Sequence, residues 1–588
     1  DSRGHYELNA SGSDTLVFSY VGYTTQEVPV NGRSNVNVVL SVSSSELSQV
    51  VVVGYGTQRK ENLTAAVDII DTKQIASRGN GNVTEMLQGV SPNLNITPGS
   101  TTAGEPGGKP SINIRGIGTL TGDYAPYVLV DGVPMDINAV NSSDIQSITV
   151  LKDAAAAAIY GSKGAFGVIL ITTNSGSGKK KIQIRYSNNI SFSNPIGRPH
   201  MENSLKYITA FDQASINAGL GANFTPENYD RIEKYMAGEI KEETWLMPDS
   251  SDWMGNGIWS IAGNGNNDWM YIFYKDVTTR QKHNVDISGG GDKTSYYVSA
   301  GLWDQPDELR YGGQFYKRYN VTANVTSKAT DWMTFKFNSK YVNERNRYFN
   351  TKEGYDRNTF YHDFYRTNSF RPRILPNGEF SDISDIPSLV DGGKVDVYGS
   401  QYILSLGAIL EPVKNWETVI SYNYTNSNSR YDDNKKTIYG TDPRGQKYVH
   451  AYPTSSYTTN FVADNNTLFN ITSSYSIALD KHNFYVMGGF ESQSDLLNGI
   501  TGSKNDMLTS SVPSISTSTG TINLNDNKSH WASESFFGRF RYNFREKYLL
   551  EINGRYDGSS RFADDSRWLH YGLTSNDVVD TAQSLQLR

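Results

Sequence analysis

The chain of 588 residues contains no cysteine, and this absence excludes disulfide bonds, thiolate metal ligands and a cysteine nucleophile. Its eight histidines are scattered without the spacing of metal ligands. No long basic run occurs and the formal net charge is -7, so nucleic acid is not an expected partner. We therefore expect no metal site and no cofactor.

Long apolar runs are also missing from the chain. A membrane-spanning helix needs about 20 consecutive apolar residues, whereas the apolar share of the chain is only 37% and its apolar runs are short. Transmembrane strands are different, because only every second residue faces lipid. The sequence therefore predicts no transmembrane helix, and low hydropathy leaves a membrane-spanning barrel open.

The most informative segment is residues 111–173, where short apolar runs alternate with glycine-containing turns. In order, it contains SINIRG at 111–116, PYVLVDGVP at 126–134 and DIQSITVLKDAAAAAIYGSKGAFGVILITT at 144–173. The runs at 127–130, 148–151 and 168–173 are rich in β-branched residues and predict buried strands. The segment therefore predicts a compact α/β domain.

Turn and cap residues separate these predicted strands. The pair Asp131 and Gly132 predicts a tight turn. Asp153 is expected to cap the N-terminus of the alanine-rich helix that follows. Gly161 and Gly164 are expected to end that helix, because glycine tolerates the left-handed conformation of a C-terminal cap.

These ordered motifs closely resemble the plug domain of SusC-like (SusC/RagA-type) TonB-dependent transporters of the outer membrane. The resemblance implies a mainly β fold, namely a transmembrane antiparallel β-barrel behind an α/β plug. It assigns eight residues to the plug motif: Arg115, Gly116, Asp131, Gly132, Lys152, Asp153, Gly161 and Gly164. It also makes four plug-loop residues candidates for facing the substrate: Thr119, Thr121, Asp123 and Tyr124.

The N-terminal region has two parts. Residues 1–43 contain short predicted strands at 16–23 and 36–40, and they resemble a partial Ig-like or carboxypeptidase-regulatory-like β-sandwich of the same family. Residues 44–56 begin with a polar spacer that leads into a four-valine run, which favours an extended conformation. In the family this position matches the Ton box, which TonB captures by adding it as a strand to its own sheet. The Ton-box candidates are therefore Val50, Val51, Val52, Val53, Gly54 and Tyr55. An ordinary internal strand of the plug is the alternative.

Behind the predicted plug at 57–177, apolar residues recur at every second position. Short polar breaks, each followed by an aromatic residue, precede Trp332, Trp416, Phe484 and Tyr548, and they predict tight hairpins. Long polar connections are expected at 194–282, 345–399 and 426–458. Short turns on one side and long loops on the other are typical of outer-membrane barrels.

We expect about eleven strands between Ile182 and Gly558, within a barrel region at 178–568, and no assignment for 569–588. SusC-like barrels have 22 strands, so the expected fold is about half of such a barrel. An open edge would leave several backbone groups unpaired in hydrocarbon, at a cost of several kcal/mol each. We therefore expect the missing half to be supplied by more of the natural chain or by another chain.

The resemblance further implies a function. It predicts import of oligosaccharides across the bacterial outer membrane, driven by the TonB–ExbB–ExbD complex, with plug and N-terminal extension facing the periplasm. A SusD-like surface lipoprotein is expected as a lid, and no catalytic residue is expected. The alternatives are an oligopeptide importer of the same family, a non-transporting glycan-binding adhesin and, least favoured, a soluble glycoside hydrolase, which needs a carboxylate pair.

Overall fold

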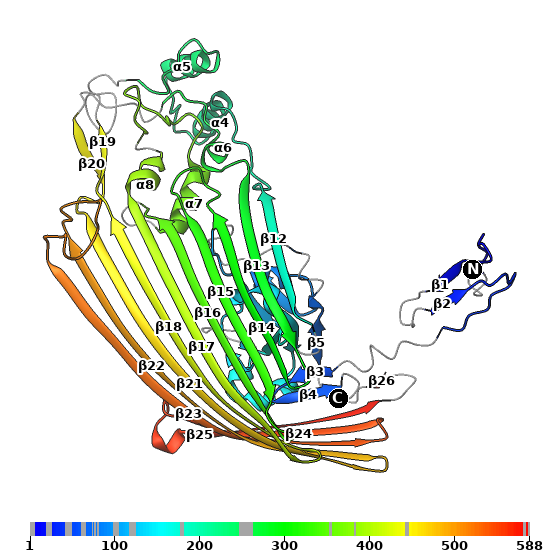
Figure 1. Ribbon diagram of the computed structural model, residues 1–588. Coiled ribbons are helices and arrows are strands. Elements are labelled where there is room, and N and C mark those ends of the chain that lie inside the picture. Colours follow the sequence, from blue (N-terminus) through cyan, green and yellow to red (C-terminus); the bar gives the residue numbers. More distant parts are fainter. Residues whose placement is uncertain are drawn as a thin grey trace.

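The computed structural model describes residues 6–18, 26–40, 50–59, 66–72, 75, 78, 81–97, 105–116, 125–176, 181–245, 263–351, 356–381, 384–441, 446–579 and 584–585. An N-terminal hairpin is followed by an α/β domain and then by a long curved sheet (Figure 1). Among the described residues, no helix is long and apolar enough to cross a membrane.

Among its described residues, the N-terminal part forms one hairpin where a partial sandwich is predicted. Its strands β1 (Thr15–Phe18) and β2 (Gln26–Pro29) form a two-stranded antiparallel sheet. The strand predicted at 36–40 is wrong, because this segment is not paired as a strand. Val39 is 86% exposed, and strand propensity does not produce a strand where no neighbouring strand pairs with the segment.

The α/β domain is built around a mixed sheet in the order β5-β10-β11-β8-β9, in which β8 and β11 run parallel. Two further pairs, β3-β4 and β6-β7, form separate small sheets. The strands are β3 (Val50–Val53), β4 (Gly56–Arg59), β5 (Val67–Ile70), β6 (Leu94–Thr97), β7 (Ser111–Ile114), β8 (Tyr127–Val130), β9 (Val133–Pro134), β10 (Ile145–Leu151) and β11 (Val168–Thr173). The helices are α2 (Val83–Leu87), η2 (Ile137–Ala139), η3 (Ser142–Asp144), α3 (Ala154–Ala157) and η4 (Ala158–Gly164).

The predicted strands and the predicted cap of this domain are present. Ile148, Val150 and Ile169 are fully buried in its apolar core. The Asp153 carboxylate accepts a hydrogen bond from the Ala156 N–H at 2.7 Å and so caps α3. The sequence therefore placed both the central strands and the helix start correctly.

The two glycines behind α3 act in different ways. Gly161 has φ 58° and ψ -139°, so it interrupts the helix with a conformation that glycine adopts readily. Gly164 does not have a positive φ, and its predicted left-handed cap is wrong. A Cβ at Gly164 would lie 2.8 Å from the Ala157 carbonyl oxygen, so close packing requires glycine there.

Within the described residues the long sheet has 13 strands, and neighbouring strands pair antiparallel. Eleven of these strands lie between Ile182 and Ser559, as predicted. The strands are β12 (Gln183–Ser193), β13 (Thr278–Gly290), β14 (Thr294–Pro306), β15 (Phe315–Lys328), β16 (Met333–Phe349), β17 (Gly393–Val413), β18 (Trp416–Lys435), β21 (Ser456–Leu479), β22 (His482–Asn505), β23 (Ile522–Phe544), β24 (Tyr548–Ser559), β25 (Trp568–Val579) and β26 (Ser584–Leu585). The last two extend the sheet into the segment left unassigned from the sequence.

All four predicted hairpin turns are present between these strands. The turn between β21 and β22 lies at 480–481, slightly earlier than predicted, so Phe484 is the third residue of its strand. Asn415, Asp480 and Arg545 have positive φ angles at three of the turns. The short polar breaks therefore predicted correctly where the tight turns lie.

Helices gather at the opposite end of the sheet, in the long connections (Figure 1). They are α4 (Ser204–Asn217), α5 (Pro226–Met236), α6 (Trp269–Phe273), α7 (Arg357–Arg366) and α8 (Ile386–Asp391), with the hairpin β19 (Ile438–Thr441) and β20 (Lys447–Ala451) beside them. The shorter connection between β24 and β25 carries η5 (Asp564–Ser566). Trp269, Phe273 and Phe360 are buried in a cluster of their own, so these connections pack together, and we call them the loop cap.

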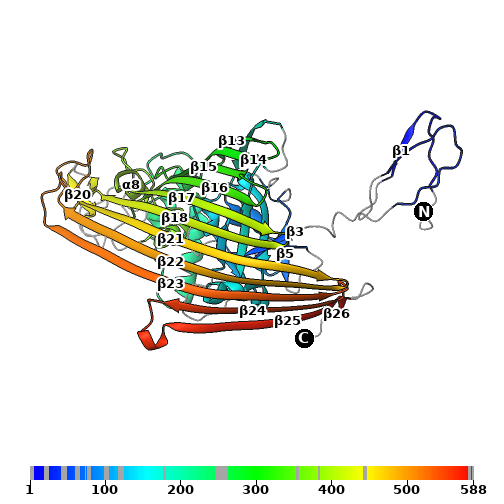
Figure 2. The ribbon, with the colours of Figure 1, turned by 60° about the horizontal axis from the view of Figure 1, so that its bottom comes forward.

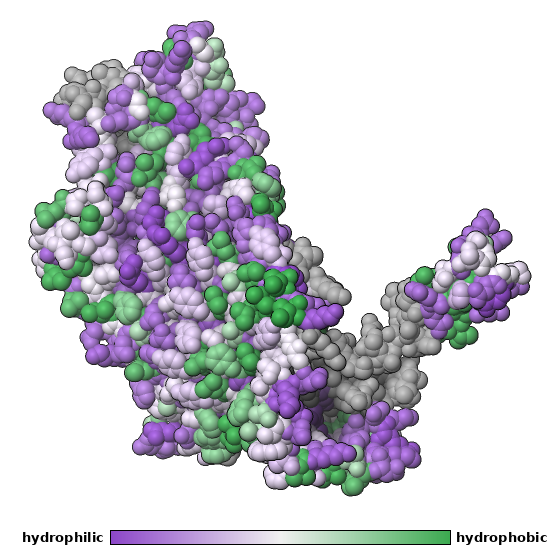
Figure 3. All heavy atoms as spheres, viewed as in Figure 1, coloured by the Kyte–Doolittle hydropathy of each residue, from purple (hydrophilic) through white to green (hydrophobic). Residues whose placement is uncertain are grey.

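The two faces of the long sheet differ. Figure 2 shows that the sheet is a deep trough, and the α/β domain lies within its curve. Apolar side chains such as Phe335, Phe337 and Leu406 are exposed on the outer face, where Figure 3 shows hydrophobic patches. Polar residues of the inner rows, such as Asn324 and Lys340, instead hydrogen-bond to the α/β domain.

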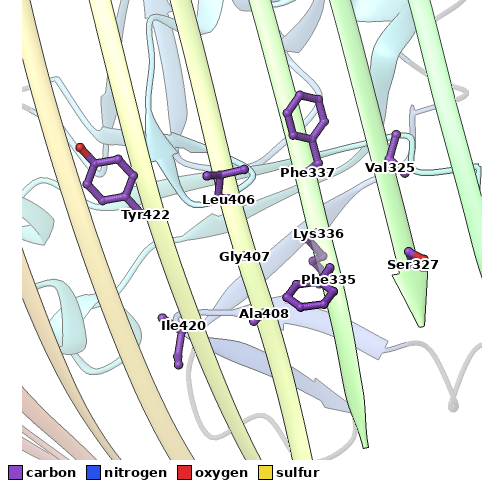
Figure 4. A pocket seen from close by; sticks show the side chains of 10 residues that line it. All are labelled: Val325, Ser327, Phe335, Lys336, Phe337, Leu406, Gly407, Ala408, Ile420 and Tyr422. Atoms are coloured by element: carbon purple, nitrogen blue, oxygen red, sulfur yellow. The ribbon is translucent and has the colours of Figure 1, made fainter. Parts of the chain in front are cut away.

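A groove of about 470 Å³ on the outer face illustrates this difference (Figure 4). Phe335, Phe337, Leu406, Ile420 and Tyr422 line it, and Ala408 leaves room between the larger side chains. The groove therefore lies on the lipid-compatible side, away from the α/β domain.

Candidate functional site

The turn between β3 and β4 is held against the inner wall of the long sheet. The ring of Tyr55 stacks between those of Tyr160 and Phe537, with centroid distances of 5.5 and 4.4 Å. The Gly54 carbonyl accepts a hydrogen bond from Arg539 Nη1 at 3.0 Å. The predicted Ton-box segment is thus extended, as expected, but it is paired and docked rather than detached.

Glu491 of β22 is the centre of this contact. Its Oε2 accepts a hydrogen bond from the Tyr55 hydroxyl at 2.5 Å. Its Oε1 lies 3.2 Å from Lys163 Nζ and 3.0 Å from Arg555 Nη2. One wall carboxylate therefore joins the β3–β4 turn, helix η4 and strand β24.

Arg555 completes the same cluster from β24. Its Nη1 donates to the Ile159 carbonyl at 2.9 Å, and its Nε donates to Asp557 Oδ1 at 2.6 Å. The guanidinium is almost fully buried, so each of these bonds forms in a medium of low dielectric. We call Tyr55, Lys163, Glu491, Arg539 and Arg555 together the Tyr55 latch.

Burial fixes the protonation state of the tyrosine in the latch. Desolvation, with the Glu491 charge as the second cause, raises the pKa of the Tyr55 phenol well above its usual value. The phenol therefore stays protonated and donates to the carboxylate at every physiological pH. The latch holds through a charge-assisted hydrogen bond, which is stronger than a neutral one.

A second set of contacts fastens the α/β domain to the opposite part of the wall. Asp144 is 2% exposed, and its carboxylate accepts hydrogen bonds from the Tyr297 and Thr322 hydroxyls, both at 2.8 Å. Burial raises the pKa of Asp144 above its usual value. Arg318 Nη2 donates to the Gly81 carbonyl at 2.9 Å. Polar clamps on two sides therefore hold this domain in the trough.

The predicted plug-motif residues do not form a single site. Asp131 has φ 50° in the predicted turn, and its carboxylate accepts from Thr173 Oγ1 at 2.6 Å and from Lys340 Nζ at 2.5 Å. Lys152 is buried inside the domain, where it pairs with Asp68 and donates to the Pro92 carbonyl at 2.5 Å. These residues shape and dock the domain at separate places.

The remaining plug-motif residues have local roles. Arg115 and Gly116 have φ angles of 62° and 102° directly after β7, and the Arg115 N–H donates to the Asn93 carbonyl at 3.0 Å. Gly132 has φ 85° in the turn after β8. The four candidate substrate-facing residues, Thr119, Thr121, Asp123 and Tyr124, lie outside the described residues.

Sequence reasoning missed the wall residues of the latch. Arg539 and Arg555 lie at positions that alternate with the apolar residues of their strands, and this alternation was the available signal. It could not show that Glu491, 436 residues from Tyr55, meets the plug rather than water. Within the described ranges, no group of three His, Asp or Glu side chains could hold a metal ion.

Gly161 adjoins the latch and offers a test of its packing. A Cβ at Gly161 would overlap the Asp557 carboxylate and lie 3.1 Å from Arg555 Cδ. A residue other than glycine would also be strained there, because φ is positive. We expect Gly161→Ala to lower the free energy of local opening of residues 158–164 by about 1–3 kcal/mol, measured by hydrogen exchange. Gly89→Ala is the control, because Gly89 has φ 70° but no atom near its Cβ. If the two substitutions lower the free energy of local opening around their own sites equally, the packing argument is contradicted.

The described geometry can be compared with known proteins. The family described as TonB-dependent Receptor Plug Domain matches residues 59–168. TonB-dependent receptor P26 of Formosa agariphila is 27% identical over 600 residues, covering 97% of this chain and 54% of the receptor. TonB-dependent receptor SusC of Bacteroides thetaiotaomicron is 26% identical over 618 residues, with the same two coverages.

Solved structures agree in fold. The RagAB peptide importer in its open-open state matches with a TM-score of 0.74 at 22% identity, covering 90% of this chain and 58% of that chain. Its closed-closed state matches with a TM-score of 0.72. The chain spans about half the length of the curated relatives it matches, in keeping with a 13-stranded sheet that does not close. The α/β domain inside the trough thus matches the plug-domain family, and the chain as a whole is similar to SusC-like TonB-dependent receptors over the plug and part of the barrel.

Proposed function

We propose that this chain forms the gated part of an outer-membrane importer that is opened from the periplasmic side by TonB. The observation that supports this most is the docked β3–β4 hairpin, because its turn is held on the inner wall by the Tyr55 latch. Val50 to Tyr55 would serve as the Ton box, which TonB captures by strand addition. Pulling on β3 would then break the latch and move the plug, admitting the solute.

The proposal keeps the domain division expected from the sequence. Residues 44–56 carry the coupling segment, 57–177 the plug and 178–568 the barrel part, with β25 and β26 extending the barrel beyond it. The short turns and the Ton box would face the periplasm, and the capped loops would face outward to a SusD-like lipoprotein lid. No covalent step on the solute belongs to this mechanism, so no catalytic residue is assigned.

The proposed solute is an oligosaccharide, with an oligopeptide as the second candidate. Sugars are held by aromatic faces together with amide and carboxylate groups, and the long loops are rich in such residues. The peptide alternative is favoured by one observation, the fold similarity to structures named as the RagAB peptide importer. A non-transporting adhesin is disfavoured, because it needs no plug.

Uptake of defined solutes tests this proposal. We expect cells that produce the protein to take up labelled oligosaccharides, and a variant lacking residues 50–55 to insert in the outer membrane but to lose uptake. Uptake of peptides but not of glycans would reverse the order of the two solutes. Unchanged uptake by the deletion variant would contradict the transport mechanism itself.

A further inference from the structure

A short segment of the plug reaches the capped loops at the outer end of the trough. Within this segment, residues 105–109, the Gly107 N–H donates to Gln305 Oε1 at 3.3 Å and Asn346 Nδ2 donates to the Pro106 carbonyl at 3.4 Å. Gly107 has φ 73°, and a Cβ there would lie 2.6 Å from the Tyr316 ring. The segment, which we call the plug strap, is therefore packed closely onto β14, β15 and β16.

Glu105 connects the plug strap to helix α7 through a contact with Arg357. It is 6% exposed, and its Oε1 lies 3.3 Å from Nε of Arg357, the first residue of α7. Tyr361, one turn further along the helix, faces the same carboxyl group and lowers its pKa. The Arg357 guanidinium lies 3.9 Å from the Tyr348 ring centroid, which fixes its position. A buried carboxyl group of the plug thus contacts helix α7 at Arg357 and faces Tyr361 on the same helix.

The other side of α7 packs against aromatic residues of the loop cap and of β16. Phe360 is 3% exposed, and its ring lies 4.7 Å from that of Phe349 and 6.0 Å from that of Phe273 on α6. Asp356 caps α7 by accepting from the Thr359 N–H at 2.7 Å, so the helix begins at a defined residue. Helix α7 is therefore packed between the loop cap and the plug strap.

We infer that Glu105 is a positioning residue that ties helix α7 to the plug, so that the arrangement of the outer loops is transmitted to the plug, and that acidification tightens this tie. The transmission of loop arrangement to a moving plug rests on the proposed function. The tie itself is a property of the folded chain and does not depend on solute or on TonB.

The direction of the pH effect follows from burial. Desolvation raises the pKa of Glu105 to about 7, although the Arg357 charge opposes it, and Asp307 adds to the rise. A raised carboxyl pKa means that the docked strap binds a proton that the undocked strap, with an ordinary carboxyl pKa, does not bind. The docked state is therefore favoured most at low pH, and this advantage is lost as pH rises towards about 7.

Other titratable groups face Glu105 from the packed elements. They are Arg357 and Tyr361 on α7, Asp307 after β14, Tyr274 after α6 and Tyr348 on β16. Burial raises the pKa of Asp307 to about 6 and raises those of Tyr274 and Tyr361 above the usual value. The two tyrosines stay neutral between pH 6 and 8, so Asp307 is the second candidate for a pH effect in this range.

Hydrogen exchange of residues 357–366 tests the inference in the full protein, without solute or TonB. We expect the protection factor of α7 to fall about tenfold between pH 6 and pH 8, after correction for intrinsic exchange, because one pKa unit corresponds to a tenfold change. Glu105→Gln keeps a neutral side chain of the same shape, so α7 should stay protected at both pH values. Helix α5, at residues 226–236, is the internal reference.

Three further variants separate the causes. Glu105→Ala should lower α7 protection at both pH values, whereas Glu202→Gln, at an exposed carboxylate paired with Lys206, should behave as the unmodified protein. His362→Gln should keep the pH dependence, because His362 points to solvent beside Asp363. A tenfold fall that persists in Glu105→Gln, or that vanishes in His362→Gln, would overturn the inference. If the unmodified protein takes up no solute but its α7 exchange depends on pH as expected, the proposed function alone is contradicted.

Discussion

Arg555→Met is expected to release the β3–β4 turn from the barrel wall. The arginine is almost fully buried and bonds to Glu491, Asp557 and the Ile159 carbonyl. Removing one partner of a buried ion pair leaves an uncompensated charge and costs about 3–5 kcal/mol. We expect hydrogen exchange of residues 50–59 and 158–164 to rise by at least a hundredfold, since 1.4 kcal/mol corresponds to a factor of ten.

The control for this substitution is Arg561→Met. Arg561 follows β24 in the chain and is exposed; its guanidinium lies 4.3 Å from the centroid of the half-buried Trp531 ring and takes no part in the latch. It should leave the exchange of the hairpin unchanged. If the Arg555→Met hairpin stays as protected as that of the control, the Tyr55 latch does not hold the coupling segment.

A partner variant shows whether Glu491 and Arg555 act together. Glu491→Gln removes the charge that Tyr55 and Lys163 also contact. In a double-mutant cycle the two substitutions should be strongly non-additive, because each already breaks the same cluster.

Local patterns of the sequence predicted much of this fold. Alternation placed eleven strands, and the turns before Trp332 and Trp416 set the side with short hairpins. Asp153 identified the start of α3 through its capping chemistry. Strands, tight turns and helix caps depend on residues that are neighbours in the chain, so one sequence is enough to predict them.

Other features of the fold could have been predicted but were not. Helix α5 begins with a capping box between Thr225 and Asn228 and has Pro226 in its first turn. That signal lies inside a connection interpreted only as a long polar loop. In contrast, the segment at 36–40 has strand propensity without a partner, and propensity alone cannot supply one.

The site itself depends on contacts between distant parts of the chain. The hydrogen bond from Tyr55 to Glu491 spans 436 residues, and the ion pair from Arg357 to Glu105 crosses from a loop helix to the plug. Neither pair has a sequence signature, because the residues meet only after the sheet curves around the plug. The valine run could therefore be identified as a coupling segment without indicating what holds it.

The most direct test of the mechanism is a reversible lock on the coupling segment. The rings of Tyr55 and Phe537 lie 4.4 Å apart, and the chain has no cysteine of its own, so Tyr55→Cys with Phe537→Cys introduces a single pair of thiols, on two residues that are in contact. Each single variant, measured in parallel, controls for loss of the tyrosine hydroxyl and of the stacked rings. Uptake is compared between oxidised and reduced cells, with the extent of cross-linking measured on the same samples.

If the coupling segment must leave the wall before the plug moves, uptake is abolished in the oxidised double variant and restored by reductant, while both single variants are insensitive to oxidation. Full uptake by the double variant with its disulfide completely formed would contradict the account, because the plug would then open with its coupling segment still fixed to the barrel.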